Sequence, residues 1–504
     1  MLSDIPVIPH FFCSMTTEQR SRISQVAERV RMAYPELKRD ERFRAFIPQS
    51  LPDGPCLHLD DLSEIHLAEN SAEFVAMQER ARLRAGHGDL VAAIAPDVDG
   101  YENYCRNQLG LGSVDWIHPK ATENPLRVAH ACWEDRSVRH ELIHRLRTDA
   151  LMHLHLHMGT VGGWELAELL QIHSRRPLKV IGPPPALTQL VNNKVAFTQI
   201  VEWLLGPEAV PQTFSAWNSA TLSKVVSEFP DSIRTVGVKR PNSAGGMGIV
   251  ILEMAPFRGR SLQDIHDLLM EALAPIHWDD GSELLLGAWE DDVLCSPSVQ
   301  MWLPPTGDGM PVIEGIFAQH MRQGTAEFDG TTAANLPESV GQRIADQAWQ
   351  IACLFQQLGY IGRCSVDTIL AGSSLSSARI EFIECNGRWG GTSAPMTLMN
   401  RLFGDWCRRP FAARSVSLDG LRQVTFQHFL NHLGDHAYDQ RTGQGHFILF
   451  VPGRMRMEST VGLIVVGNSY MEVDRLLKST FPELLATAVS ATDSFAQSLR
   501  PKVC

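Results

Sequence analysis

The chain has 504 residues, which at roughly 150 residues per domain predicts about three domains. Apolar residues make up 44% of it and charged residues 20%, the proportions of a globular protein rather than of a disordered one. Its 45 basic and 57 acidic side chains give a formal charge of −12. This excess of acidic groups argues against a nucleic-acid partner, because non-specific binding to nucleic acid needs clustered Lys and Arg.

The first residues lack the basic and long apolar segments of a secretion signal, and no run of 18 apolar residues occurs. We therefore expect a cytoplasmic protein that does not bind membranes. Ten cysteines are spread along the chain without a C-x-x-C pair, which excludes a zinc ribbon. The cysteines are expected to be mostly reduced thiols.

Short apolar runs alternate with helical stretches over about the first 180 residues. The runs 89–95 and 178–181 end at Pro or Gly and predict buried strands, and 162–170 predicts an amphipathic helix. Strands that alternate with helices are typical of an α/β domain, which we expect over residues 1–182.

A helix is predicted from Pro185 to about Leu205. Pro lies at its first turn, Gly206 and Pro207 follow its last turn, and its apolar residues recur at three-four spacing. Lys194 lies within this helix, and by itself it would be an ordinary solvent-exposed lysine.

The middle of the chain alternates predicted strands with two helices. The strands are 235–239, 249–252, 298–303, 312–318, 363–370 and 379–386, and the helices are 261–273 and 339–358. After about residue 411 the pattern changes, and strands at 447–451 and 463–466 precede a helix at 471–478. This segment, 411–504, predicts a small C-terminal α+β module.

A lysine and a glycine-rich loop lie together between two of these strands. Lys239 ends the first strand, and the loop that follows contains Ser243, Gly245, Gly246 and Gly248. Glycines allow backbone N–H groups to approach phosphate oxygens, and the lysine supplies a positive charge. The loop lacks the G-K-S/T of a P-loop, and a strand rather than a helix follows it. Taken alone, such a loop is more often a plain hairpin.

A second group of polar side chains lies in and just after the predicted strand 379–386, where side chains alternate between the two faces. Glu384, Asn386 and Arg388 share one face, and two oxygen ligands at this spacing suit Mg²⁺. Asp367 lies on the preceding strand and would face Glu384 if the two strands are antiparallel neighbours. The alternative is the polar face of an exposed strand.

The order of these parts resembles the ATP-grasp superfamily over about residues 180–400. The resemblance implies an α/β and α+β multidomain fold, with a pre-ATP-grasp domain at 1–182, an ATP-grasp domain at 183–410 and the C-terminal module. It also implies roles for the residues. ATP would be bound by Lys194, Lys239, Ser243, Gly245, Gly246, Gly248 and Glu290, the last at the ribose. Mg²⁺, or Mn²⁺, would be held by Asp367, Glu384 and Asn386, and Arg388 would be catalytic.

Three features together are most similar to the pheganomycin-type peptide ligases: the α/β N-terminal domain, the small C-terminal module and the string Ile383-Glu-Cys-Asn-Gly-Arg-Trp-Gly-Gly-Thr-Ser393. These enzymes imply small-molecule carboxylate and amine substrates, such as amino acids or peptides. They also imply an acyl phosphate, release of ADP, a place in specialised-metabolite biosynthesis and a homodimer. Gly387 departs from the family, where many relatives have Pro, and should loosen the turn. An ATP-grasp kinase and a non-catalytic nucleotide-binding protein remain alternatives.

Two histidine patterns could suggest a metal. His153, His155 and His157 alternate on a predicted strand, where a structural or substrate-lining role is the more common one. His140 and His144 match H-E-x-x-H but lie in a basic helix without a third ligand, so we expect an ordinary exposed helix face there.

Overall fold

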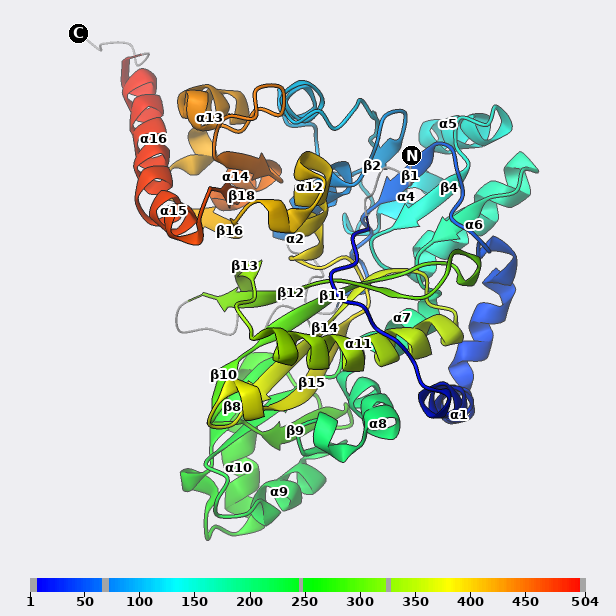
Figure 1. Ribbon diagram of the computed structural model, residues 1–504, viewed down its shortest axis with the longest axis vertical. Helices are drawn as coiled ribbons and strands as arrows, with labels where there is room; N and C mark the ends of the chain where they lie inside the picture. Colours follow the sequence, from blue (N-terminus) through cyan, green and yellow to red (C-terminus); the bar gives the residue numbers. More distant parts are fainter. Residues whose placement is uncertain (1–6, 66–71, 244–247, 323–327, 499–504) are drawn as a thin grey trace.

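The computed structural model describes residues 7–65, 72–243, 248–322 and 328–498, and three β-sheets organise them (Figure 1). A five-stranded sheet near the N-terminus is parallel, in the order β3-β2-β1-β4-β5. Its strands are β1 (Cys56–Leu59), β2 (Leu90–Ala92), β3 (Asp115–Ile117), β4 (His153–Leu156) and β5 (Lys179–Ile181). Helices of this segment are α4 (Val128–Glu134), α5 (Arg136–Arg147) and α6 (Val161–Ser174), with the short α2 (Ala72–Ala76) and α3 (Tyr101–Asn103). The expected α/β character is confirmed, although β2 is shorter than the predicted strand.

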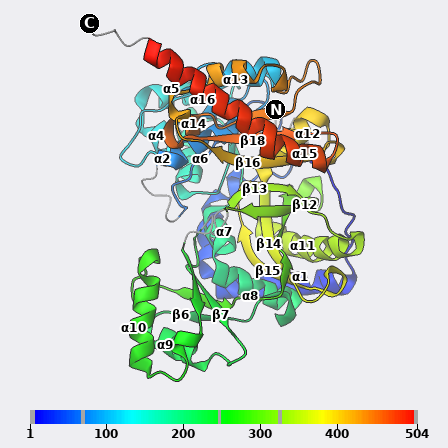
Figure 2. The ribbon, with the colours of Figure 1, turned by 90° about the vertical axis from the view of Figure 1, so that its left-hand side faces the viewer.

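A four-stranded antiparallel sheet lies at the opposite end of the molecule, covered by α9 and α10 (Figure 2). Its order is β6-β9-β7-β8. Its elements are β6 (Thr213–Ala216), α9 (Ser219–Glu228), β7 (Thr235–Lys239), β8 (Ile249–Glu253), α10 (Leu262–Leu273) and β9 (Leu284–Ala288). The predicted pairing of the two strands around the glycine-rich loop is confirmed, because Lys239 is opposite Ile249.

The largest sheet has nine strands and crosses the centre of the molecule. Its strands are β10 (Val293–Cys295), β11 (Pro297–Leu303), β12 (Val312–Met321), β13 (Phe328–Ala333), β14 (Gly362–Ala371), β15 (Arg379–Asn386), β16 (Phe411–Ser417), β17 (Phe447–Phe450) and β18 (Thr460–Val466). The strands of the 411–504 segment continue this sheet, since β16 pairs with β13. The boundary at 410 stays a prediction, but these strands do not form a sheet of their own.

Helices cover the large sheet in two groups. One apolar core joins the sheet to α1 (Thr17–Ala33), α7 (Pro185–Asn192), α8 (Lys194–Leu205) and α11 (Glu338–Leu358). The other surrounds the C-terminal strands with α12 (Ser393–Phe403), α13 (Phe426–Leu433), α14 (Gly453–Glu458), α15 (Tyr470–Arg475) and α16 (Phe481–Ser498). Within the described ranges, no helix combines the length and the apolar character that a membrane span requires.

The prediction of a single helix from Pro185 to Leu205 is wrong, because the helix is interrupted at Asn193. This residue is extended, and its side-chain oxygen accepts hydrogen bonds from the backbone N–H groups of Val195 and Ala196, both at 3.0 Å. Asn is a strong N-cap, so it begins a second helix instead of continuing the first. Lys194 becomes the first residue of α8 and is 3% exposed, not solvated.

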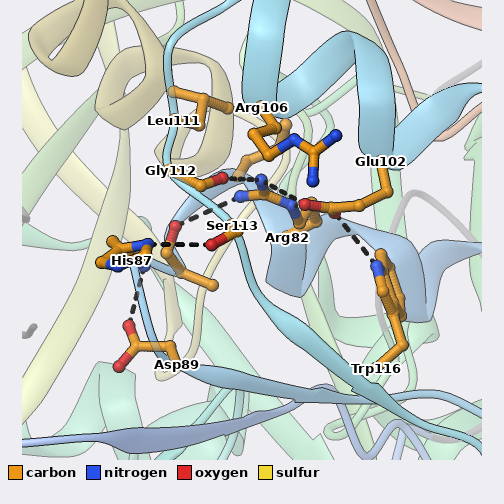
Figure 3. A network of polar contacts seen from close by, with 12 residues as sticks. Arg82, His87, Asp89, Glu102, Arg106, Leu111, Gly112, Ser113 and Trp116 are labelled. Atoms are coloured by element: carbon orange, nitrogen blue, oxygen red, sulfur yellow. Dashed lines mark hydrogen bonds and ion pairs between the residues drawn. The ribbon is translucent and has the colours of Figure 1, made fainter.

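A buried arginine holds in place a loop that leads into the five-stranded sheet (Figure 3). Arg82 is completely buried and donates to both carboxylate oxygens of Glu102, at 2.6 and 3.0 Å. It also donates to the Gly112 carbonyl at 2.6 Å, and Glu102 accepts from the Trp116 indole at 3.1 Å. A planar guanidinium bound on both sides in this way fixes the segment that leads into β3.

Neutral histidines are buried between β1 and β4. His58 donates from Nε2 to a carboxylate oxygen of Asp89 at 3.0 Å, while neither ring nitrogen of His153 has a hydrogen-bond partner within the described chain. Burial lowers the pKa of His153 to about 4, with His58 adding to the effect and Asp89 opposing it. The native state therefore favours an uncharged imidazole at this position.

We expect His153→Leu to stabilise the protein, and more so in acid. The wild type loses stability as the pH falls from 6.5 to 4, because only the unfolded chain takes up the proton of His153 in that window. The variant lacks this loss, so its advantage should grow by about 3 kcal/mol across the window. Urea unfolding at pH 7 and pH 4.5 measures the difference, and an advantage that does not change with pH would contradict the prediction.

Candidate functional site

A cleft of 1220 Å³ is lined by residues of both the four-stranded and the nine-stranded sheet. Of the residues expected from the sequence, Lys194, Lys239, Ser243, Glu290, Asp367, Glu384, Asn386 and Arg388 all line it. Pockets for small molecules usually have volumes of about 300–1,000 Å³, so this cleft has room for more than one ligand. Gly245 and Gly246 lie outside the described residues.

Two lysines and one carboxylate meet in this cleft. The Lys194 ammonium donates to the Ser243 carbonyl at 2.6 Å and lies 3.1 Å from a carboxylate oxygen of Glu384. Burial lowers the pKa of Lys239, and nearby Lys194 lowers it further while Glu384 opposes both. The two ammonium groups place positive charge at this point of the cleft, which suits a polyanion.

The pairing that brings Asp367 opposite Glu384 is confirmed, since β14 and β15 are antiparallel neighbours in that register. Asn386 donates from its side-chain nitrogen to one Asp367 oxygen at 3.0 Å. The other oxygen, Oδ1, is buried and has no hydrogen-bond partner among the described residues. A buried carboxylate oxygen without a partner, beside a second carboxylate and an amide, fits a hard cation such as Mg²⁺.

The two carboxylates are electrostatically different. Burial and the adjacent Glu384 raise the pKa of Asp367. Burial also acts to raise the pKa of Glu384, but the positive charge of Lys194, its hydrogen bond and the charge of Lys239 outweigh it and lower that pKa. Without a cation the protein therefore favours a proton on Asp367 and a negative charge on Glu384.

Arg388 is held by two neutral amides. Its terminal nitrogens donate to the side-chain oxygens of Asn386 at 2.7 Å and Asn192 at 2.6 Å. The role of Asn192 was missed, although it lies at the end of α7, two residues before Lys194. Its oxygen also accepts from the Gly387 backbone N–H at 3.0 Å.

The expectation that Gly387 loosens its turn is wrong. A Cβ at this position would come within 2.4 Å of Val191 Cγ2 and 2.8 Å of the Asn192 side chain. The chain needs glycine here because α7 approaches closely. Proline could not donate the hydrogen bond that Asn192 accepts.

The described ends of the glycine-rich loop are ordered by local contacts. Arg240 donates its backbone N–H to the Gly248 carbonyl at 2.9 Å, and Ser243 donates its hydroxyl to the Arg240 carbonyl at 3.1 Å. Gly248 has a φ of +78°, a conformation that favours glycine. These contacts place the Ser243 carbonyl where Lys194 reaches it.

Another part of the cleft is apolar. Ile249, Ile251, Leu285 and Trp289 line it from the small sheet, and Ile369 and Ile383 line it from the large sheet. Gly237 makes room for Trp289, since a Cβ there would lie 2.8 Å from the indole ring. Glu290 follows Trp289, and its carboxylate lies 3.1 Å from Arg379 in an ion pair. Such a pair of walls suits a flat, weakly polar ring.

The histidine patterns have different surroundings. His140 and His144 are exposed on α5, as expected. His153 and His155 are buried, and His157 lines the cleft. In the described part of the chain, one trio of potential metal ligands lies close together, His10, Asp405 and Cys407, and it includes none of these histidines.

No family model matches the chain, and no curated protein matches it. Solved structures do resemble it. N5-carboxyaminoimidazole synthetase from Staphylococcus aureus, complexed with ADP, is 12% identical and covers 86% of this chain and 99% of its own length, with a TM-score of 0.51. Biotin carboxylase from Campylobacter jejuni, as a β-γ-ATP complex, is 13% identical and covers 88% of this chain and 95% of its own length, with a TM-score of 0.50. Both are ATP-grasp enzymes. With its three sheets and the cleft between two of them, this chain has the ATP-grasp fold.

Proposed function

We propose that the protein is an ATP-dependent carboxylate–amine ligase that forms an amide through an acyl phosphate. The observation that carries this proposal is the meeting of Lys194 and Lys239 with the Asp367–Glu384–Asn386 group in one cleft. A ligase needs this combination, because phosphoryl transfer depends mostly on positioning and on neutralising phosphate charge.

The nucleotide would occupy the part of the cleft between the two sheets. Lys194, Lys239 and the loop from Ser243 to Gly248 would bind its phosphates, and Glu290 would bind its ribose after exchanging its contact with Arg379. Asp367, Glu384 and Asn386 would hold Mg²⁺ or Mn²⁺, which when bound neutralises charge on the phosphate oxygens. The unpartnered oxygen of Asp367 is the main support for this assignment.

The reaction would proceed in two steps. A substrate carboxylate oxygen attacks the γ-phosphorus of ATP, the bond from this phosphorus to the bridging oxygen breaks, and ADP leaves. The amine nitrogen then attacks the acyl carbon, the carbon–oxygen bond to phosphate breaks, and the nitrogen loses a proton. Arg388, which donates to Asn386 at 2.7 Å, would stabilise the negative oxygen that develops in the second step.

The resemblance to pheganomycin-type peptide ligases supports finer proposals. It favours an amino acid or a peptide as substrate, a place in specialised-metabolite biosynthesis, and a homodimer. These rest in part on the string from Ile383 to Ser393, which runs from the end of β15 through the loop that contains Arg388 to the first residue of α12.

A screen for ADP release tests the proposal. The full chain is incubated with Mg²⁺ and ATP and with pools of amino acids and short peptides, and products are identified by mass. We expect ADP together with an amide, and hydroxylamine should trap the acyl phosphate as a hydroxamate. A phosphorylated product without an amide would favour a kinase. Bound nucleotide without ADP release in any pool would favour a non-catalytic protein and overturn the proposal.

A further inference from the structure

Part of the cleft is built by the N-terminal domain rather than by the two sheets around the nucleotide residues. Arg80 and His157 line it together with the apolar side chains Leu62, Ile65, Phe74 and Met77. The domain reaches Arg388 here, since Trp389 donates its backbone N–H to the His157 carbonyl at 3.0 Å. Charged and apolar groups of this domain therefore lie next to Arg388, which follows β15, the strand of Glu384 and Asn386.

Positive charge is in excess in this part of the cleft. Arg84 is ion-paired with the buried Asp60, and the same carboxylate is 4.0 Å from Arg80. Arg388 donates its hydrogen bonds to the neutral amides of Asn192 and Asn386, while Glu384 and Asp367 act on it electrostatically. The Asp60 carboxylate is thus shared by the guanidinium groups of Arg80 and Arg84. A third guanidinium group, that of Arg388, lies close enough to act on Arg80 electrostatically. A guanidinium excess of this kind favours an oxyanion.

Polar groups here also lack partners. Within the described chain, the one hydrogen bond that Arg80 donates runs from Nε to the Met77 carbonyl at 3.2 Å, so its terminal nitrogens are free. His157 is 3% exposed, and its Nδ1 faces an Asp60 oxygen 3.5 Å away without a hydrogen bond to any residue that the structure describes. Arg80 therefore brings donors to the cleft lining that no described residue uses, and a ligand could accept from them.

His157 can bind an oxyanion without carrying a charge itself. Burial lowers the pKa of His157 well below its usual range, and Arg80, Arg84 and Arg388 lower it further. A neutral imidazole still has one N–H to donate. The guanidinium of Arg80 supplies the charge and the planar pair of donors that match a carboxylate.

We infer that Arg80 and His157 bind the carboxylate of the substrate that is phosphorylated, and that Leu62, Ile65, Phe74 and Met77 surround its apolar body. The substrate class is then a carboxylate with a hydrocarbon or aromatic side chain, such as an apolar amino acid. This inference rests on the proposed ligase function, because that function brings a carboxylate-bearing substrate into the cleft beside ATP. A polar or cationic side chain would find no partner against these four residues.

The test compares Arg80→Met and Arg80→Lys with wild type, and uses Arg106→Met as a matched control. Arg106 is an exposed arginine of the same domain. Binding of L-leucine, L-phenylalanine, their primary amides and L-glutamate is measured by ligand-detected NMR with MgADP present, and KM by ADP release. We expect the two apolar carboxylates to bind, and Arg80→Met to weaken them about tenfold or more. Arg80→Lys should lose less, and the control should lose nothing.

The outcomes separate this inference from the function on which it rests. MgADP affinity should be the same in all four proteins, and failure of the wild type to bind MgADP would overturn the proposed function itself. MgADP binding without binding of the apolar carboxylates, or a preference for glutamate, would overturn the substrate class. Equal affinity of wild type and Arg80→Met for the carboxylates would overturn the subsite. It would also be overturned if Arg80→Met weakened the binding of the primary amides as much as that of the acids.

Discussion

Glu384→Gln is expected to reduce ADP formation by about 10³-fold while the chain stays folded. Gln has the same shape, but it removes the negative charge that lies 3.1 Å from Lys194 and opposite Asp367. The variant would bind Mg²⁺ weakly and leave two lysines without their counter-charge, so the triphosphate would be misplaced. ADP release at saturating ATP and varied Mg²⁺ measures the loss.

Two further variants make this result interpretable. Asp367→Asn should show a loss of similar size, because the unpartnered oxygen of Asp367 is the other carboxylate ligand proposed for the cation. Glu202→Gln changes an exposed acid on α8, the helix that begins with Lys194, and should leave turnover unchanged. Glu384→Gln turnover within tenfold of wild type, in a protein with the same melting temperature, would remove Glu384 from the site.

The site could be predicted where it depends on local pattern. Side-chain alternation gave Glu384, Asn386 and Arg388 one common face, and the glycine-rich turn favoured a hairpin that carries Lys239. The pairing that places Asp367 opposite Glu384 was a condition of the prediction, which the structure meets. These features need only two neighbouring elements. The same reasoning predicted the α/β character of the N-terminal segment, because strand and helix periods are properties of short segments, whereas the multidomain ATP-grasp fold was implied by the resemblance.

Contacts between distant segments could not be predicted in this way. Nothing near Arg80 or Asp60 in the sequence indicates that they meet His157, which is far along the chain on the end of β4. The pairing of β13 with β16 is equally remote, so the C-terminal strands looked like a separate unit. The helix break at Asn193 was missed because the apolar spacing continues across it, although Asn is itself an N-cap signal.

A buried ion pair behind the cleft should matter most for stability. The side chains of Glu314 on β12 and Arg363 on β14 are both completely buried and hydrogen-bonded to each other. Arg363 also donates to Thr397 of α12, and its guanidinium lies 4.5 Å from the centre of the Trp389 ring. We expect Glu314→Gln to lower the free energy of unfolding by about 3–5 kcal/mol, because it leaves the guanidinium charge buried without a counter-charge.

Urea unfolding followed by tryptophan fluorescence measures this effect, since Trp302 and Trp389 both flank Arg363. The double variant Glu314→Leu with Arg363→Met should regain most of the loss, because it removes both charges and keeps the volume apolar. Asp474→Asn, which breaks the exposed pair with Lys478, should cost no more than about 1 kcal/mol. If the double variant is as unstable as Glu314→Gln, the contacts of Arg363 with Thr397 and the tryptophans, and not the buried charge, determine the stability of this region.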